Sequence, residues 1–179
     1  MKNISVIESV WIIVILAFFL IAYIIYVLIS FFFMNSFKKK IDTGCETINV
    51  LIYQKLQSLY ECSCILMKLG YDNPKLLEFV KSQKEKTYEK LEIKDLDVLF
   101  SKTEKLYSTV KSVCVNLKRT DDTKELVNNL KTIDELNTKY FENIQLYNTY
   151  VVGFNYWRNL YFTKWVKVLF RKDEIDTIK

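Results

Sequence analysis

The most constraining feature of this chain of 179 residues is a stretch of 25 residues without charge, from Val10 to Met34. Its polar side chains are those of Tyr23, Tyr26 and Ser30. A helix of this size is about 37 Å long, whereas the hydrocarbon core of a bilayer is about 30 Å thick. The stretch therefore predicts a transmembrane helix, and we expect residues 10–34 to contact the lipid bilayer.

The flanks of this stretch predict its fate and its orientation. A cleaved signal peptide has a shorter apolar stretch, of about 7–15 residues, and a cleavage site of small residues, so we expect this one to remain attached. Lys2 and Glu8 precede it, whereas Lys38, Lys39 and Lys40 follow it. Because cytoplasmic flanks carry the excess of Lys and Arg, we expect a single-pass protein with its N-terminus outside and its soluble domain in the cytoplasm.

The composition of the remaining chain predicts helices. The whole sequence has only 3 Gly and 1 Pro, whereas sandwiches, barrels and α/β folds need many tight turns. The formal net charge of +5 is spread over the chain. Such a charge suits an anionic membrane surface and is too dilute to indicate a nucleic-acid partner.

Apolar residues recur every three or four positions after the membrane stretch, which is the spacing of one helix face. Residues 41–68 carry such a face: Ile41, Cys45, Ile48, Ile52, Leu56, Leu59, Cys62 and Leu66. This helix is either continuous with the membrane helix or kinked at residues 42–44. Gly70 predicts its C-terminal cap, and Pro74 predicts the start of a second helix that ends near residue 91.

Two further helices are expected. After a connection at residues 92–95, the third spans residues 96–119, and a turn with an aspartate cap follows at residues 120–122. The last helix has the strongest periodicity, with a seam of Leu126, Leu130, Ile133, Leu136, Tyr140, Ile144, Tyr147, Val151 and Phe154. Alternating steps of three and four residues are typical of a coiled coil. We therefore expect an all-α fold, in which the transmembrane helix leads into an antiparallel bundle of three or four long helices.

These features divide the chain into five parts. We expect a short N-terminal flank (1–9), a transmembrane anchor (10–34), a basic juxtamembrane segment (35–40), a helical bundle (41–172) and a polar tail (173–179).

The sequence offers little for catalysis, metal binding or cofactor binding. It has no histidine, which is the commonest general base and metal ligand. Cys62 and Cys64 are too close for the usual two-residue metal or redox spacing. The adjacent acids at residues 121–122 and 134–135 diverge by about 100° on a helix. We therefore expect no enzyme, no metal and no cofactor, although a carboxylate-based enzyme stays as a less favoured alternative.

The segment from residue 156 to residue 172 interleaves aromatic and basic side chains, which is typical of a surface in a lipid interface. Together with the juxtamembrane lysines it supplies the candidate membrane-surface contacts: Lys38, Lys39, Lys40, Trp157, Arg158, Trp165, Lys167 and Arg171. Aromatic residues at helical spacing are more often core residues. The alternative is therefore that these rings cap the end of the bundle while the charges face solvent.

Two segments resemble signatures of the LemA family. Residues 41–50 are similar to its V-D-E-A-W-S-N-I-D-V segment, and residues 140–149 are similar to its Y-N-x-x-V-x-x-Y-N-T signature. Cys45 stands where the family has Trp, and Asn155 stands where it has Pro. The resemblance covers residues 41–172 in order, and it implies a diverged member with an antiparallel helical bundle on a membrane anchor.

These observations favour a membrane-anchored helical scaffold or interaction protein without catalytic activity. We expect a protein partner or self-association through the helical faces. The alternative is a lipid-surface-binding or sensing module that uses residues 156–172.

Overall fold

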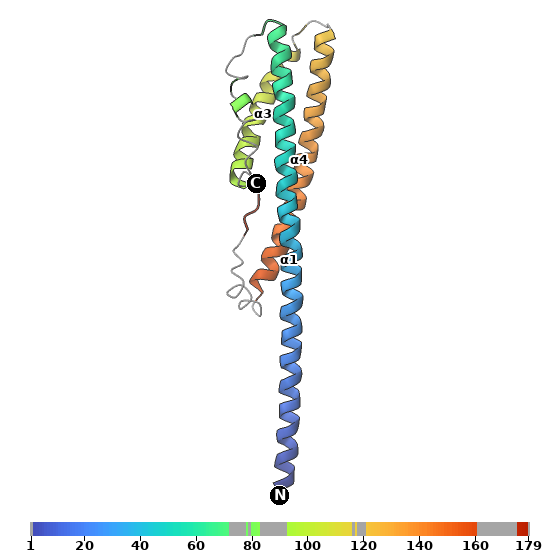
Figure 1. Cartoon of the computed structure of the whole chain (residues 1–179), viewed down its shortest axis with the longest axis vertical. Helices are drawn as coiled ribbons and strands as arrows, with labels where there is room; N and C mark the ends of the chain where they lie inside the picture. The colour runs from blue at the N-terminus through green and yellow to red at the C-terminus, as the bar shows by residue number, and fades with distance from the viewer. Residues whose placement is uncertain are drawn as a thin grey trace. The chain divides into compact units, whose positions relative to one another are not determined.

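The computed structural model describes residues 2–71, 78, 80–82, 93–115, 117, 121–160 and 175–178. Three long helices account for most of them: α1 (Lys2–Lys68), α3 (Ile93–Val115) and α4 (Asp121–Asn159) (Figure 1). No strand occurs in these ranges, which confirms the all-α class for the described part of the chain. The expected second helix, over residues 74–91, lies outside the described residues except for 78 and 80–82, which are helical.

The chain divides into two compact units. Unit 1 consists of residues 1–40 and 150–176, and unit 2 consists of residues 41–149 and 177–179. Because α1 and α4 each extend past a unit boundary, both helices contribute residues to both units.

α1 is one uninterrupted helix of 67 residues, so residues 41–68 continue the helix of the membrane stretch, as one of the two alternatives expected. The side-chain hydroxyl of Thr47 donates to the carbonyl of Thr43, four residues earlier in the helix, at 3.0 Å. Gly44 is helical, and a Cβ atom there would lie 3.5 Å from the Tyr147 ring, an ordinary contact distance.

Gly70 ends α1 in the way that the sequence predicts. Its φ is +82°, in the left-handed region that favours glycine. The Gly70 amide donates to the carbonyl of Met67 at 3.0 Å, and the Tyr71 amide donates to the carbonyl of Leu66 at 2.9 Å. This pair of bonds is a Schellman motif, so the predicted cap is confirmed.

The bounds of α3 differ from the expected ones. α3 begins at Ile93, so the expected connection at residues 92–95 is wrong for its last three residues. Asp95 lies in the first turn, where a carboxylate interacts favourably with the helix dipole. Leu96 is already fully buried, which favours ordering of this turn. The helix ends at Val115 rather than near residue 119.

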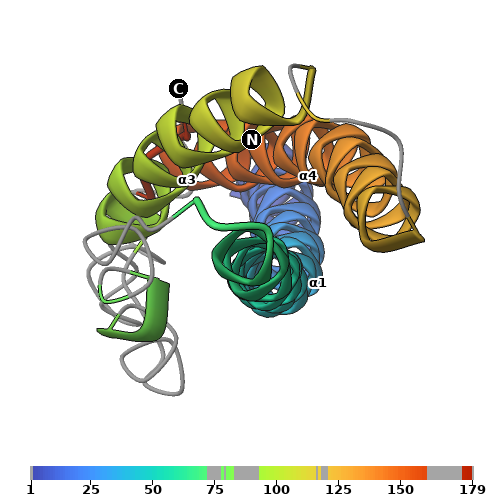
Figure 2. The same ribbon diagram turned by 90° about the horizontal axis from the view of Figure 1, so that it is seen from above.

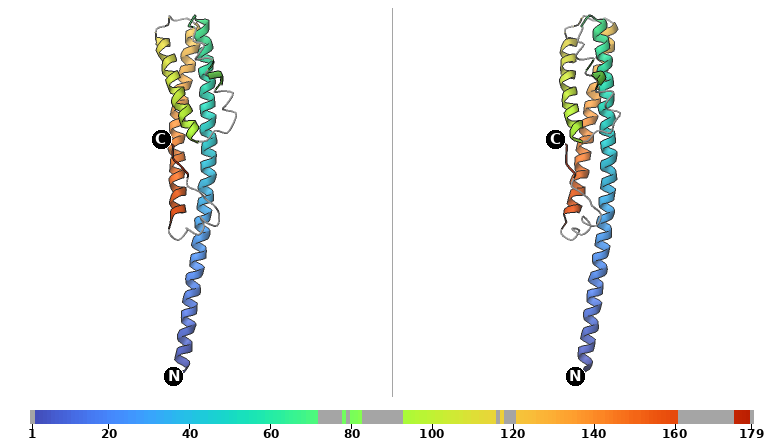
Figure 3. Two further views of the ribbon diagram at one scale, coloured as in Figure 1. Left: turned by 90° about the vertical axis from the view of Figure 1, so that its left-hand side faces the viewer. Right: turned by 60° about the vertical axis from the view of Figure 1, so that its left-hand side comes forward.

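Within unit 2, α3 and α4 run in opposite directions. The rings of Phe100 and Tyr140 are stacked with centroids 3.6 Å apart. Further along α3, the hydroxyl of Tyr107 donates to Asp134 at 2.5 Å. The residue number rises along α3 as it falls along α4, and Figure 3 shows the same opposition in the order of colours.

α1 contacts both other helices of unit 2, and the view from above shows all three side by side (Figure 2). Gly44 lies against Tyr147 of α4, and Lys55 pairs with Glu104 of α3. All of the expected face residues of α1 are buried except Cys45, which is half-buried. The α4 seam is buried except for Ile144, which is half-buried. The predicted apolar faces therefore form the core between the described helices.

Unit 1 contains an apolar helical stretch that no described residue covers. The large apolar side chains from Val10 to Ile25 are 38–69% exposed. Within the described part of the chain, one helix is long and apolar enough to cross a membrane. Tyr26 and Val27 are half-buried, and fully buried residues begin at Ser30 and Met34. The apolar stretch before the first buried residue therefore has about 20 residues, which is the length that crosses about 30 Å of hydrocarbon.

Candidate functional site

Lys55 is the one buried lysine among the described residues, and it lies in the apolar face of α1. Its side chain is 2% exposed. Counting from Ile48, the buried positions 52, 55, 59 and 62 follow in steps of four and three residues. Leu56, which was predicted for this face, is also buried, whereas Lys55 was not predicted for it. The strict alternation of steps, which places a lysine at a core position, is the signal that could have identified it.

The Lys55 ammonium group has two partners on α3. It forms an ion pair with Glu104, whose side chain is 39% exposed, and it lies 4.0 Å from the centroid of the Phe100 ring. Both contacts favour the charged form of lysine. Burial nevertheless lowers the pKa of Lys55 from 10.5, and the hydrogen bond and charge of Glu104 only partly oppose this effect. The charge of Lys55 therefore depends on Glu104.

An aromatic cluster continues from this ion pair into α4. Phe100 stacks on Tyr140 and meets the edge of Phe141 at 5.6 Å. The hydroxyl of Tyr140 is buried and has no hydrogen-bond partner among the described residues, and the same holds for the Oδ1 atoms of Asn49 and Asn137. Burial raises the pKa of Tyr140 far above 10, with a smaller contribution from the charge of Asp97. Tyr140 is therefore neutral at physiological pH.

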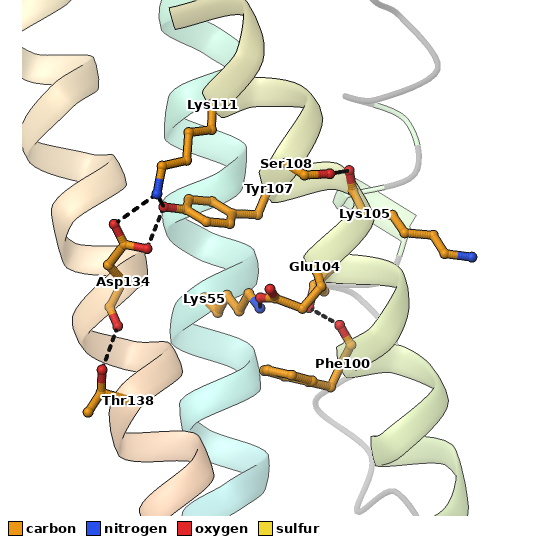
Figure 4. Close-up of polar contacts among 10 residues, drawn as sticks. Lys55, Phe100, Glu104, Lys105, Tyr107, Ser108, Lys111, Asp134 and Thr138 are labelled. Atoms are coloured by element: carbon orange, nitrogen blue, oxygen red, sulfur yellow. Dashed lines mark hydrogen bonds and ion pairs between the residues drawn. The ribbon is translucent and has the colours of Figure 1, made fainter. Parts of the chain in front are cut away.

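A second polar cluster joins α3 to α4 closer to the surface (Figure 4). Tyr107 donates to Asp134 at 2.5 Å, and Lys111 donates to the Tyr107 oxygen at 2.9 Å and to Asp134 at 3.4 Å. Burial and the bond to Asp134 raise the pKa of Tyr107, with a smaller opposing effect of Lys111. A phenol with a raised pKa is a hydrogen-bond donor at neutral pH rather than a base or nucleophile. This cluster therefore acts as an interhelical link.

The acids considered as a catalytic pair point to different partners. Asp134 binds Tyr107 and Lys111 of α3, whereas Glu135 lies 4.0 Å from Lys131 of its own helix. The side chains of residues 121 and 122 lie outside the described residues. Within the described part of the chain, no three His, Cys, Asp or Glu side chains are grouped to hold a metal ion.

The four cysteines, all of them described, form no disulfide and lie in different environments. Cys62 is fully buried, whereas Cys45, Cys64 and Cys114 are half-buried. Burial, together with the charge of Glu61 and the neighbouring Cys114, raises the pKa of Cys62 to about 12. Because the thiolate is the reactive form of cysteine, Cys62 is chemically inert at neutral pH.

The candidate membrane-surface residues that the structure describes all lie in unit 1. Lys38, Lys39 and Lys40 are exposed on α1. Trp157 of α4 stacks on Phe33, with centroids 4.9 Å apart and ring planes 6° apart. The stack therefore joins Trp157 to the end of the apolar stretch.

Arg158, by contrast, is only 5% exposed, and its guanidinium group donates to Asn159 at 3.2 Å. The remaining candidates, Trp165, Lys167 and Arg171, lie outside the described residues.

Lys40 and Gly153 explain how α1 and α4 approach each other in unit 1. The Lys40 ammonium lies 5.2 Å from the ring centroid of Tyr150 and 6.0 Å from that of Phe37. A Cβ atom on Gly153 would lie only 2.8 Å from the Phe37 ring, so a larger residue would displace this ring. Beyond this contact, a groove of about 490 Å³ is lined by Val152, Asn155, Tyr156, Asn159 and Leu160.

Comparison with known proteins found no matching family model, no matching curated protein and no matching solved structure. The resemblance to the LemA family therefore stays a prediction.

Proposed function

We propose that this chain is a membrane-anchored helical scaffold or interaction protein, LemA-like and without catalytic activity of its own. Residues 10–34 cross the bilayer once, with the N-terminus outside. Residues 41–172 form an antiparallel bundle in the cytoplasm. The observation that carries this proposal is the apolar stretch of α1 between Val10 and Ile29, which holds no fully buried residue and matches the thickness of a bilayer in length.

The polar groups of unit 2 support an interaction protein rather than an enzyme. Lys55, Glu104, Tyr107 and Asp134 are all engaged in contacts between helices. Catalytic groups, by contrast, converge on a space that a substrate can enter. Such interhelical pairs hold neighbouring helices in one register, which is what a scaffold requires.

Exposed aromatic and aliphatic side chains on α4 supply a surface for a partner. Phe141 is 55% exposed and meets the buried Phe100 edge-on, and Leu146 is 52% exposed five residues later. Aromatic residues are enriched at protein–protein interfaces. We therefore place partner or self-association contacts on this part of α4.

Crosslinking in native membranes at native expression levels tests the proposal. We expect the full chain to form a crosslinked complex, with itself or with a partner, and the double substitution Phe141→Ser with Leu146→Ser to reduce its yield severalfold. Glu142→Ser is the matched control, because it changes an exposed polar residue of the same helical turns. Recovery of monomer alone from the unmodified chain would contradict the proposal.

The second candidate function is binding to an anionic lipid surface, and the stack of Trp157 on Phe33 favours it. This contact joins an aromatic ring of α4 to the end of the apolar stretch of α1, beside three exposed lysines. Interfacial aromatic rings and basic residues near anionic headgroups are both favourable, the latter by about 1 kcal/mol each.

Fluorescence quenching tests the lipid contact on the full chain. With Trp11 and Trp165 replaced by Phe, the fluorescence of Trp157 reports its own surroundings. In bilayers that contain anionic lipid and brominated phospholipid, we expect the fluorescence of Trp157 to be quenched. We expect weaker quenching when Lys38, Lys39 and Lys40 are replaced by Gln. The triple replacement of the exposed lysines Lys102, Lys105 and Lys124 is the control. Absence of quenching in the unmodified lysine background would refute the lipid contact.

A further inference from the structure

Two asparagines of α4 each pair with the backbone of one residue near the C-terminus. Within unit 1, the Asn155 amide donates to the carbonyl of Ile175 at 2.8 Å, and the Ile175 amide donates back to Asn155 Oδ1 at 3.3 Å. Within unit 2, Asn148 and Ile178 form the same two bonds, at 2.8 and 2.9 Å. A carboxamide has the donor and acceptor of a peptide group, so each asparagine satisfies both backbone groups of its isoleucine.

The spacing along the two segments agrees with this pattern. Asn148 and Asn155 are seven residues apart, which is about 10.5 Å along a helix, and they face nearly the same side, about 20° apart. Ile175 and Ile178 are three residues apart, and three residues cover about 10 Å only when the backbone is extended. In the polyproline II form of an extended chain, which has three residues per turn, every third residue faces the same side, so one segment can present one residue to each asparagine.

We propose that Asn148 and Asn155 are binding sites for the backbone of an extended peptide segment, and that the chain's own residues 175–178 occupy them. The class of ligand is an extended segment with an apolar residue at every third position. Ile178 is buried and Ile175 is half-buried, whereas Asp176 and Thr177 between them are exposed. Because the polar recognition is directed at the backbone, it tolerates changes of the exposed residues.

Not every asparagine of α4 pairs with a segment outside the helix, as Asn143 shows. The amide of Asn143 donates to the carbonyl of Lys139 in its own helix, at 2.8 Å. Asparagine is also a poorer helix former than alanine, so a position in the middle of a long helix needs a compensating contact. At residues 148 and 155 the pairing with the C-terminal segment supplies it.

Residue-resolved hydrogen exchange of the full chain in micelles tests the sites. We expect the amides of Ile175 and Ile178 to be protected. Asn155→Ala lowers protection at Ile175 by about tenfold, and Asn148→Ala does the same at Ile178, which corresponds to one lost hydrogen bond in each case. Asn143→Ala is the control and leaves both amides unchanged. Unprotected amides in the unmodified chain, or protection that survives both substitutions, would overturn the proposal.

Competition with a peptide tests the same sites without altering the protein. A synthetic peptide with the sequence of residues 173–179, in excess over the isotope-labelled full chain, should lower protection at Ile175 and Ile178 of the chain. The same peptide with N-methyl groups on its two isoleucine amides should not compete, because it cannot donate to either asparagine. Equal competition by both peptides would show recognition by side chains and would refute backbone recognition.

Discussion

The two ends of α1 belong to one continuous helix, but their side chains suit different surroundings. Between Val10 and Ile29 the helix is apolar on all sides, and its large side chains are exposed except those of Tyr26 and Val27, which are half-buried. Between Ile41 and Leu66 the apolar residues occupy one face, which is buried, and the other faces are polar. The main-chain hydrogen bonds are helical throughout, so the surroundings of each end are decided by the distribution of its side chains.

The two stretches of α1 differ in whether they contain charged side chains. In the first stretch no charge occurs. In the second, Lys55 lies within the buried face and is compensated by Glu104 and the Phe100 ring. A polar residue at a core position of packed helices costs stability and specifies the register. The first stretch therefore requires apolar surroundings on every side, whereas the second requires particular partners.

The largest effect should come from charges in the first stretch. Leu16→Arg with Leu20→Arg should abolish retention of the chain in carbonate-washed membranes, because each arginine near the centre of a membrane helix costs about 2.5–3.5 kcal/mol. Flotation of membranes on a density gradient measures the bound fraction. Val50→Arg, at an exposed apolar position of the same helix, should leave the bound fraction unchanged. Equal loss in both variants would remove the distinction between the two ends.

The next effect should come from breaking the ion pair of the second stretch. Glu104→Gln leaves a buried ammonium without its counter-charge and should lower the free energy of unfolding by about 2–3 kcal/mol, less than for a fully buried pair because the Glu104 side chain is 39% exposed. Lys55→Met with Glu104→Gln removes both charges at similar volume and should restore stability to within about 1 kcal/mol of the unmodified chain. Denaturant titration in mild detergent, followed by circular dichroism, measures both.

Lys111→Met is the control for this pair. The Lys111 ammonium binds Asp134 at 3.4 Å, and both side chains are more than half exposed. Exposed pairs contribute little, so the change should stay within about 1 kcal/mol. If Glu104→Gln were as mild as Lys111→Met, the buried position of Lys55 would have no energetic consequence.

The smallest effect should be the contribution of Cys62 to the pH dependence of the free energy of unfolding. Its folded-state pKa of about 12 lies above its ordinary value of 9.0, so the unfolded chain loses its proton first. The stability contributed by the protonated thiol is complete below pH 9 and decreases as pH rises from 9 towards 12, by about 1.4 kcal/mol per pH unit at most. Lys55 acts in the opposite direction, because its lowered pKa makes stability rise with pH towards 10.5.

Comparison with Cys62→Ala separates these contributions. Urea titrations between pH 8 and pH 10, under reducing conditions, should show a smaller loss of stability with pH in this variant than in the unmodified chain. Cys64→Ala, at a half-buried thiol, is the control. A pH dependence that Cys62→Ala leaves unaltered would mean that the thiol is not shielded from solvent in solution.

Helix type and apolar faces could be predicted because both depend on local spacing. The cap at Gly70 follows from a glycine in the left-handed region, and the seam of α4 follows from steps of three and four residues. The predicted start of α3 was three residues too late. The burial of Leu96, which stabilises the first turn of this helix, depends on tertiary packing and is not a local property of the sequence. The second helix and the candidates Trp165, Lys167 and Arg171 stay predictions, since they lie outside the described residues.

The order of residues was enough to establish that this chain is helical, that one stretch is long and apolar enough to cross a bilayer, and that its other helices carry buried faces. Hydrophobic periodicity suffices for these conclusions because the helix repeat is the same in every protein. The tertiary structure alone decided that Lys55 meets Glu104 and that Asn155 meets Ile175. Pairing between residues 20 or 49 positions apart depends on which helices come together, and no local pattern carries that information.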